Sequence, residues 1–266
     1  MRLITWNVAR RGSRLVEQAT ALAQRKPSVV ALQEVTRQTL PGWRQAFTLM
    51  GLGHVRASLD DADVMREPKS RRATGVIVAS QGRLVDVDQP FPVPWPETVL
   101  CVTADTDLGA VEVCCLHVPN AANGEIKVRT LQGVRNGVAM TDPARRVVCG
   151  DFNTPRRELP DGRVISFARD RRGRLRPERG AEWDAAELGV VPGLRDFAYR
   201  DVYRTIHGYD RAEPSWTWRR IAGHDGGWRI DHIFASAQLR PVACLYHHDW
   251  READLSDHSA LEADFE

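Results

Sequence analysis

The sequence of 266 residues predicts an α/β fold, because short apolar runs typical of β-strands alternate with segments that repeat apolar side chains at helical spacing. Hydrophobic residues make up 42% of the chain and charged residues 27%, which is the balance of a globular protein with a large core. No internal repeat or long linker interrupts this pattern. We therefore expect residues 1–266 to form a single domain.

Three segments have the pattern of helices. Residues 13–26 carry apolar side chains on one face, begin with a candidate N-cap serine and stop before a proline. Residues 40–50 hold Pro41 in the first turn and are followed by Gly51, both common at helix ends. Residues 124–140 repeat apolar side chains at helical spacing.

Strands are predicted where short apolar runs lie between turn residues. These runs are residues 2–8, 28–32, 75–80, 84–87, 98–104, 111–116, 146–149, 228–236 and 261–265. Residues 57–70 are polar and predict a loop, whereas residues 91–96 hold three prolines, which exclude a central strand. Ordered structure is expected to resume over residues 194–204.

Residues 155–180 contain nine arginines and four acidic residues, although the net charge of the whole chain is only +2. We predict an arginine-rich surface insertion here, with a hairpin turn at residues 170–174. Lysine occurs only three times in the chain, which indicates either a GC-rich genome or selection for the guanidinium fork that matches phosphate oxygens. The insertion is thus expected to be either a solvated loop or a surface that contacts a polyanion.

Five cysteines occur without the Cys-x-x-Cys spacing of a zinc site, which predicts buried, reduced thiols and a cytoplasmic location. The chain shows no N-terminal leader with an apolar centre. Since it also lacks an apolar stretch of about 20 residues, we expect no membrane insertion.

Polar side chains follow the apolar runs at six places, where a rigid scaffold commonly presents functional groups. They comprise carboxylates, amides and imidazoles: Glu34, Asp151, Asp231, Asp257, Asn7, Asn120, Asn153, His117 and His258. Oxygen donors suit a hard cation such as Mg²⁺ or Mn²⁺. A hard cation beside histidine and aspartate suits hydrolysis of a phosphate ester. Any one of these residues alone is more often a turn former, so the prediction depends on the whole set.

The order of the motifs resembles the signature of the endonuclease/exonuclease/phosphatase superfamily. The motifs are Thr-Trp-Asn-Val at 5–8, Leu-Gln-Glu-Val at 32–35, Val-Pro-Asn at 118–120, Gly-Asp-Phe-Asn-Thr-Pro at 150–155, Ser-Trp-Thr-Trp-Arg at 215–219, Gly-Trp-Arg-Ile-Asp-His at 227–232 and Ser-Asp-His-Ser-Ala-Leu at 256–261. Within the superfamily the chain is most similar to exonuclease III and the abasic-site endonucleases. The resemblance spans residues 3–265 and implies a DNase I-like, four-layered α/β sandwich, in which two mostly antiparallel sheets pack face to face with helices outside.

The resemblance also implies a Mg²⁺-dependent phosphodiesterase, with Mn²⁺ as a possible substitute. Glu34 would be the main metal ligand, Asn7 would bind the metal or a phosphate nearby, and Asp257 would be a further acid for the metal. Asp151 would position and deprotonate the attacking water, and Asn153 would hold that water or the phosphate.

The remaining implied roles concern charge and substrate. His258, oriented by Asp231, would stabilise charge on the phosphoryl oxygens, and Asn120 would contact a phosphate. Arg156 and Arg157 are predicted to bind substrate, because the insertion would emerge beside the active site.

Three further residues are expected near a pocket for a flipped-out sugar or a terminal nucleotide, namely Trp216, Trp228 and Ile230. The alternative is that the tryptophans pack in the core. His117 departs from the abasic-site endonucleases, which usually carry tyrosine there. It is either a structural replacement or a second general acid or phosphate donor.

The predicted substrate is DNA, in duplex form, or another phosphodiester, and no obligate protein partner is evident. The leading prediction is a DNA nuclease, either exonuclease III-like or an abasic-site endonuclease. The alternatives are a phosphoesterase for small molecules or lipid headgroups, which His117 and the near-neutral charge favour, and a catalytically silent binding module.

Overall fold

The computed structural model describes residues 1–60, 74–88, 91–140, 145–221 and 224–266. Residues 61–70 of the predicted loop lie outside these ranges. Among the described helices, none combines the length and the apolar character needed to cross a membrane.

Twelve strands form two six-stranded sheets. The first sheet has the order β15 (Pro241–His247), β16 (Ala260–Phe265), β1 (Arg2–Asn7), β2 (Val29–Thr36), β4 (Thr74–Ser80), β3 (His54–Ala57). The second has the order β11 (Tyr199–Asp201), β14 (Asp231–Ser236), β8 (Arg146–Asp151), β7 (Gly109–His117), β6 (Val99–Thr106), β5 (Leu84–Asp86). Among the described strands of these sheets, only β1 with β2 and β7 with β8 pair in parallel, so both sheets are mostly antiparallel, as predicted.

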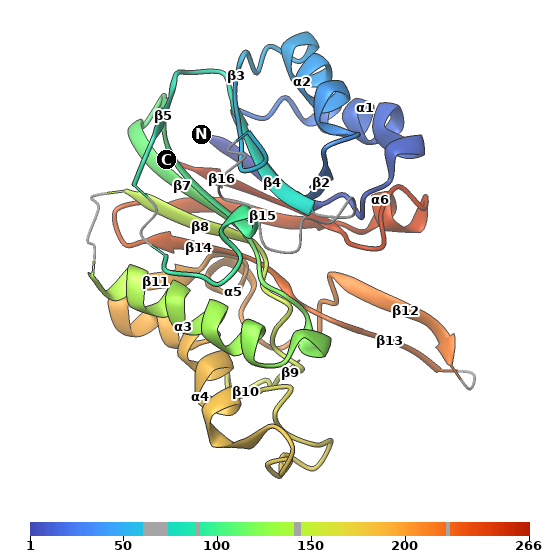
Figure 1. The fold of residues 1–266 in the computed structure, drawn as a ribbon, viewed down its shortest axis with the longest axis vertical. Helices are drawn as coiled ribbons and strands as arrows, with labels where there is room; N and C mark the ends of the chain where they lie inside the picture. Colours follow the sequence, from blue (N-terminus) through green and yellow to red (C-terminus); the bar gives the residue numbers. More distant parts are fainter. Residues whose placement is uncertain (61–73, 89–90, 141–144, 222–223) are drawn as a thin grey trace.

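The alternation of apolar side chains along the strands explains the four layers (Figure 1). Leu3 and Val147 belong to the core between the two sheets, whereas their neighbours Ile4 and Val148 face outward. Helices α1 (Leu15–Arg25), α2 (Leu40–Leu49) and α6 (His248–Glu252) cover the first sheet. Helices α3 (Glu125–Met140) and α4 (Gly180–Val190) cover the second, and α5 (Val202–His207) packs on β14 and β15. The predicted sandwich is confirmed.

Short elements complete the fold. They are the 3₁₀ helices η1 (Gly12–Arg14), η3 (Pro96–Thr98), η4 (Ala121–Asn123) and η5 (Gly193–Phe197), the hairpin of β9 (Arg157–Glu158) with β10 (Val164–Ile165), and the hairpin of β12 (Trp216–Ile221) with β13 (His224–Trp228). The β12–β13 hairpin extends away from the sandwich (Figure 1).

Most predicted elements are present, but the prediction of one strand over residues 228–236 is wrong. The chain completes β13 at Trp228 and enters β14 only at Asp231. Between them, the carbonyl of Ile230 accepts a bond from Phe152 N at 2.8 Å. The hydroxyl of Ser215 accepts hydrogen bonds from the amides of Ile230 and Asp231. The link between β13 and β14 is therefore held by hydrogen bonds that do not belong to a β-ladder.

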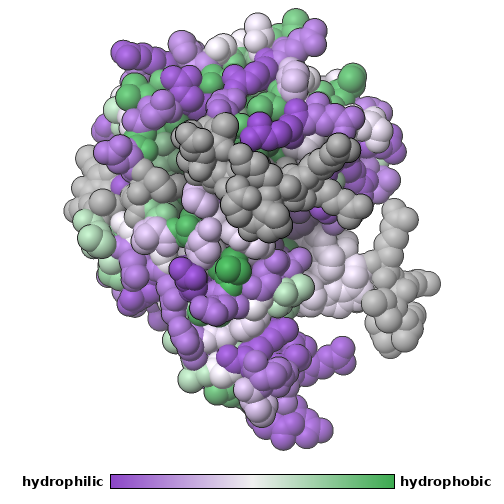
Figure 2. All heavy atoms as spheres, viewed as in Figure 1, coloured by the Kyte–Doolittle hydropathy of each residue, from purple (hydrophilic) through white to green (hydrophobic). Residues whose placement is uncertain are grey.

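The arginine-rich insertion is folded on the surface. Its predicted turn at residues 170–174 is confirmed, because Asp170 N donates to Arg174 O at 2.9 Å and Arg169 bridges to Leu175. In the lowest part of the view in Figure 2, where the insertion lies, the surface is mostly hydrophilic.

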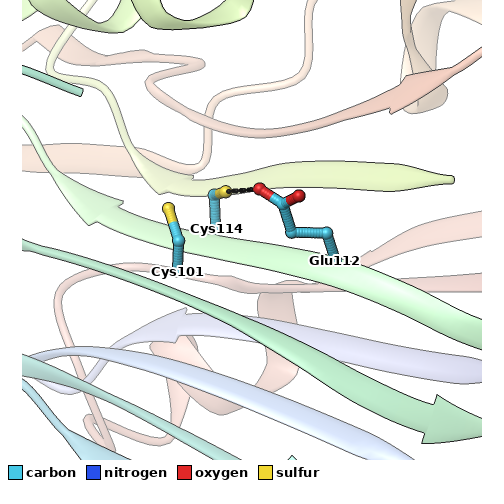
Figure 3. A group of neighbouring side chains, drawn as sticks. All are labelled: Cys101, Glu112 and Cys114. Carbon is cyan, nitrogen blue, oxygen red and sulfur yellow. Dashed lines mark hydrogen bonds between the residues drawn. The ribbon is translucent and has the colours of Figure 1, made fainter. Parts of the chain in front are cut away.

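All five cysteines are free and buried, as predicted. Cys101, Glu112 and Cys114 lie close together within the second sheet (Figure 3), near enough to surround an ion. However, Arg146 Nε already donates to Glu112 at 2.8 Å, and burial raises the pKa of the Cys114 thiol well above its usual value. Cys114 is therefore a protonated thiol that packs beside the ion pair of Arg146 and Glu112.

A buried ionic network fixes the insertion to the second sheet. Glu158 of β9 accepts bonds from Arg229 at 2.6 and 2.7 Å and from Arg204 at 2.7 Å. Arg229 also donates to Asp201 of β11 at 2.5 Å. Burial alone would raise the pKa of Glu158, but the two arginines lower it to about 2.

A second buried pair joins helices α3 and α4. Lys127 Nζ lies 2.6 Å from Glu187 Oε1 and donates to the carbonyl of Asn153 at 2.8 Å. Glu187 also accepts bonds from Thr154 Oγ1, Phe167 N and the indole of Trp183, at 2.6 to 2.8 Å. Both oxygens of this buried carboxylate thus accept hydrogen bonds. Through Asn153 and Thr154, the pair also fixes the chain that follows β8.

The Glu158 network predicts a specific loss of stability in acid. The folded pKa of Glu158 is about 2, below the unfolded value of about 4.3. The unfolded chain therefore binds the proton first as the pH falls. Glu158 should stabilise the fold fully above about pH 4.3, and this contribution should disappear progressively towards pH 2. Urea unfolding of wild type and Glu158→Gln at several pH values measures the difference, and exposed Glu178→Gln is the control. Parallel wild-type and Glu158→Gln profiles in this window would contradict the assignment.

The Lys127 pair predicts a strong coupling. Lys127→Met leaves Glu187 charged and buried without its cation, so we expect a loss of about 3–5 kcal/mol in the free energy of unfolding. The double variant Lys127→Met/Glu187→Gln should lose less than the sum of the single variants, by about 0.5–3 kcal/mol. Urea denaturation of the four proteins gives the coupling energy. Additive losses would show that the two side chains act independently.

Candidate active site

The predicted site residues gather at a cleft of about 750 Å³. Those that line it are Glu34, His117, Asn120, Asp151, Asn153, Arg156, Trp216, Trp228, Ile230, Asp257 and His258. Asn7 and Asp231 are buried and bond to Asp151 and His258 respectively. Arg157 is exposed and does not line the cleft.

Strand register explains how distant residues meet. In the second sheet, Asp151 lies opposite His117 on one side and opposite Asp231 on the other. In the first sheet, the parallel pair β1 and β2 brings Asn7 and Glu34 to the same edge. Because the sheets face each other, Asn7 Nδ2 reaches Asp151 Oδ2 at 3.0 Å and Glu34 Oε1 at 3.4 Å. The site is thus assembled across the central core.

Glu34 projects from an irregular point of β2. Its φ angle is +57°, and the pairing of β2 with β4 shifts register between Leu32 and Val35. A non-glycine residue in this conformation costs roughly 1–3 kcal/mol, and such strain is commonly found at functional sites. Arg10, which sequence reasoning missed, holds the carboxylate at 2.9 Å from Nε to Oε2.

Asp151 is fixed by the turn that follows β8. Gly150 precedes it at φ +138°, where a Cβ atom would lie 1.9 Å from the carbonyl oxygen of Leu116. Asn153 N donates to Asp151 Oδ1 at 2.8 Å. Burial raises the pKa of Asp151 to about 6, although His258 and His117 oppose this shift. The carboxylate therefore has the proton affinity of a base that works near neutral pH.

His258 forms a buried pair with Asp231. Nδ1 lies 2.9 Å from Asp231 Oδ2, which also accepts the hydroxyl of Ser215 at 2.6 Å. Burial alone would lower the pKa of His258, but Asp231 and Asp151 raise it to about 10. The imidazole is therefore a cation, and its Nε2 lies 3.8 Å from Asp151 Oδ2. Ser215 was missed by sequence reasoning, although it begins a motif.

The loop that carries His258 is tied to β1. Trp6 Nε1 donates to the carbonyl of His258 at 2.9 Å, and Ser256 Oγ donates to the carbonyl of Asn7 at 2.6 Å. These bonds fix the imidazole of His258 relative to Asn7.

His117 lies between the two sheets' carboxylates. Its Nε2 is 3.7 Å from Glu34 Oε1 and 3.8 Å from Asp151 Oδ2, too far for hydrogen bonds. The side chain is 16% exposed and faces the cleft. It is placed to donate to a third group that enters between the carboxylates.

Trp216 and Trp228 line the cleft and, among the described residues, belong to none of the apolar cores. Trp216 and Trp228 stack at 5.1 Å with 11° between their planes, and Trp216 Nε1 donates to Asp257 at 3.1 Å. Phe167 meets Trp228 edge-on at 4.9 Å. Asn120 also lines the cleft, and its side chain accepts the amide of Ala122 at the start of η4.

The oxygen donors suit a hard divalent cation. The carboxylates of Glu34, Asp151 and Asp257 line the same cleft. Asn7 orients two of them, because its Nδ2 donates to Glu34 and Asp151 while its Oδ1 accepts the amide of Ala9. Oxygen ligands of this kind are those that Mg²⁺ and Mn²⁺ prefer. Asp231 also lies close to Asp151 and His258, but its carboxylate is occupied by the imidazole and by Ser215.

Comparison with known proteins identifies the family of the chain. Residues 4–258 match the model of the Endonuclease/Exonuclease/phosphatase family. Curated protein sequences gave no significant match.

Solved structures share the fold over the full length of the chain. An AP endonuclease from Archaeoglobus fulgidus superposes with a TM-score of 0.72 at 23% identity, covering 100% of this chain and 99% of that one. A 3'-5' exonuclease from Neisseria meningitidis gives 0.68 at 21%, covering 100% of both chains. A 3' phosphatase from Neisseria bound to a product DNA hairpin gives 0.68 at 22%, covering 100% and 99%. From the family match and the shared architecture, the chain belongs to the Endonuclease/Exonuclease/phosphatase family, whose members are hydrolases that act on phosphoesters.

Proposed function

We propose that this protein is a Mg²⁺-dependent phosphodiesterase that cleaves DNA, as an exonuclease III-like nuclease or an abasic-site endonuclease. The observation that carries the proposal is the placement of Asp151, a carboxylate of raised pKa, beside the His258 cation and opposite Glu34. The names of the structures that share the fold, an AP endonuclease and a 3'-5' exonuclease, also support it.

Asp151 is the proposed base. Asn7 and Asn153 donate to its oxygens and fix their direction, so a water in the cleft would give its proton to this carboxylate. With a pKa of about 6, the group is mostly deprotonated at neutral pH yet basic enough to accept a proton.

His258 is the proposed stabiliser of phosphoryl charge. Its pairing with Asp231 keeps it protonated and orients Nε2 towards the cleft, where negative charge grows as the phosphate is attacked. Because this donor is fixed before reaction, it favours the transition state more than the ground state.

The metal would be held by Glu34, with Asp257 as a further acid, while Asn7 orients the Glu34 and Asp151 carboxylates through its Nδ2. A bound Mg²⁺ or Mn²⁺ supplies positive charge that offsets repulsion between the phosphate and the attacking oxygen. Arg10 now occupies one oxygen of Glu34 and leaves the other facing Asn7 and His117.

Substrate contacts are proposed for the walls of the cleft. Trp216, Trp228 and Ile230 offer a flat apolar surface for a sugar or a base. Asn120 and Arg156 offer donors to phosphates, and Arg157 is placed outside the cleft, where only a longer substrate would reach it.

A second candidate function is a phosphoesterase for small molecules or lipid headgroups, which the position of His117 favours. A donor between Glu34 and Asp151 can serve a leaving group of any phosphodiester, without requirement for a nucleic acid. A catalytically silent binding module is disfavoured, because each proposed catalytic side chain is chemically competent and faces or adjoins the cleft.

Labelled duplex DNA with one abasic site tests the proposal. We expect cleavage with Mg²⁺, none with excess chelator, and recovery with added Mn²⁺. Asp151→Asn should lower kcat/KM by about 10²–10⁴-fold, because it removes the base but keeps the shape. The matched variant Asp161→Asn alters an exposed carboxylate 52% accessible to solvent and should keep the wild-type rate. Cleavage of bis(p-nitrophenyl) phosphate or an inositol phosphodiester, with all DNA left intact, would establish the second candidate instead.

His117 is tested by two replacements. If it is a proton or phosphate donor, His117→Ala should lower kcat/KM by about 10²–10³-fold. His117→Tyr, which restores a hydroxyl donor, should then recover part of the rate and shift its pH dependence. Rates equal to wild type in both variants would show that the side chain only fills space.

A further inference from the structure

The arginine-rich insertion gives the cleft an unequal distribution of charge. Three of its arginines line the cleft together with Phe167: Arg156, Arg176 and Arg179. The carboxylates that line it, Glu34, Asp151 and Asp257, all come from outside the insertion and belong to the proposed metal side of the cleft. The cleft therefore combines an acidic centre with a separate cationic group.

The three arginines are held on one stretch of backbone. Arg156 N donates to Ile165 O at 3.0 Å, and its guanidinium donates to Arg169 O at 3.2 Å. Arg176 N donates to Ala168 O at 2.9 Å, and the guanidinium of Arg179 donates to Phe167 O. Residues 165–169 thus act as a common support, so the cationic group is built rather than formed by free surface side chains.

These cations have few anionic partners. Within the described parts of the chain, neither Arg156 nor Arg179 has a carboxylate within 4.0 Å, and Arg176 has only Glu178 at 3.9 Å. Burial and the neighbouring arginines lower the pKa of Arg156 and of Arg179. Crowded guanidinium groups repel one another, and an anion bound between them would remove this repulsion.

A row of aromatic rings connects the cationic group with the metal side. Asp257 accepts a bond from Trp216, Trp216 stacks on Trp228, and Trp228 meets Phe167, whose carbonyl binds Arg179. A ligand that crosses this row would place one phosphate in the cleft beside His258 and another among the arginines. Its middle part would contact flat apolar rings, which suit a sugar or a base.

We propose that Arg156, Arg176 and Arg179 form a subsite for a second phosphate, so that the enzyme prefers nucleotide substrates with two or more phosphates over those with one. The inference rests on the proposed function, since it concerns the same cleft. The guanidinium fork can donate two parallel hydrogen bonds to the oxygens of a phosphate, which is the anion that the substrate of the proposed function carries. The second phosphate is either a terminal monoester or an internal diester of a strand.

Short substrates separate these cases. Thymidylyl-thymidine carries one phosphate, its 5'- or 3'-phosphorylated forms add a terminal monoester, and the trinucleotide adds an internal diester. We expect the wild-type enzyme to have a higher kcat/KM on the two-phosphate substrates. The double variant Arg156→Gln/Arg179→Gln should lower the ratio of two-phosphate to one-phosphate kcat/KM by about 10–100-fold, mainly through KM.

A control and a folding check complete the kinetic test. Arg172→Gln removes the same charge from an exposed position of the insertion and should keep the wild-type ratio. The single variant Arg156→Gln retains the bond from Arg179 to Phe167, so it reports on binding if the double variant unfolds. An equal loss on one- and two-phosphate substrates, or no change in the ratio, would overturn the subsite.

Binding tests the subsite without turnover. In the Asp151→Asn background, calorimetry should show that thymidine 3',5'-bisphosphate binds about 10–100-fold more tightly than thymidine monophosphate, and that Arg156→Gln removes this difference. If the wild-type enzyme cleaves no substrate yet this difference is present, the proposed function fails and the subsite is retained. Equal affinities for the two ligands would reject the subsite, whatever the enzyme cleaves.

Discussion

The buried pair of Lys127 and Glu187 is the interaction on which the cleft depends. It joins α3 to α4 and reaches the carbonyl of Asn153, so it supports the turn that presents Asp151. The same carboxylate holds the backbone of Phe167, where the aromatic row ends and the arginine support begins. Buried charges are costly unless their remaining bonds are made, and here each is made within the fold. One pair thus sets the position of both ends of the cleft.

The proposed catalytic groups acquire their properties from neighbours on the other sheet or strand. Asp151 has a raised pKa because it is buried, while His258 is kept charged by Asp231 and by Asp151 itself. Asn7 spans the space between the two sheets and ties Asp151 to Glu34. None of these side chains would have the same chemistry on an isolated strand. The face-to-face packing of the sheets is therefore part of the active site as much as of the core.

Sequence patterns predicted the sheets, three helices and the cleft residues, because strand ends carry compact motifs. They failed where polar side chains are buried or apolar side chains are exposed. Helix α4 was missed since Asp184 and Glu187 are buried on its packed side and interrupt the apolar pattern. Arg10 and Lys127 stand in no motif, and their partners lie 24 and 60 residues away, so only the fold reveals them. Strand β15 was missed because it leaves Val242 and Leu245 exposed.

The division of labour along the chain follows from this architecture. Groups proposed to act on any phosphodiester lie at strand ends, where the ladders and the central core fix them. Groups that would choose among phosphodiesters stand on the insertion, whose place depends on Glu158 and its two buried arginines. Changes in the insertion can therefore alter the distribution of charge in the cleft while the sheets, and with them the placement of Asp151 and His258, stay as they are. The bonds that place the strand ends and those that place the insertion are thus largely distinct, and they meet at Glu187, which bonds to both Thr154 and Phe167.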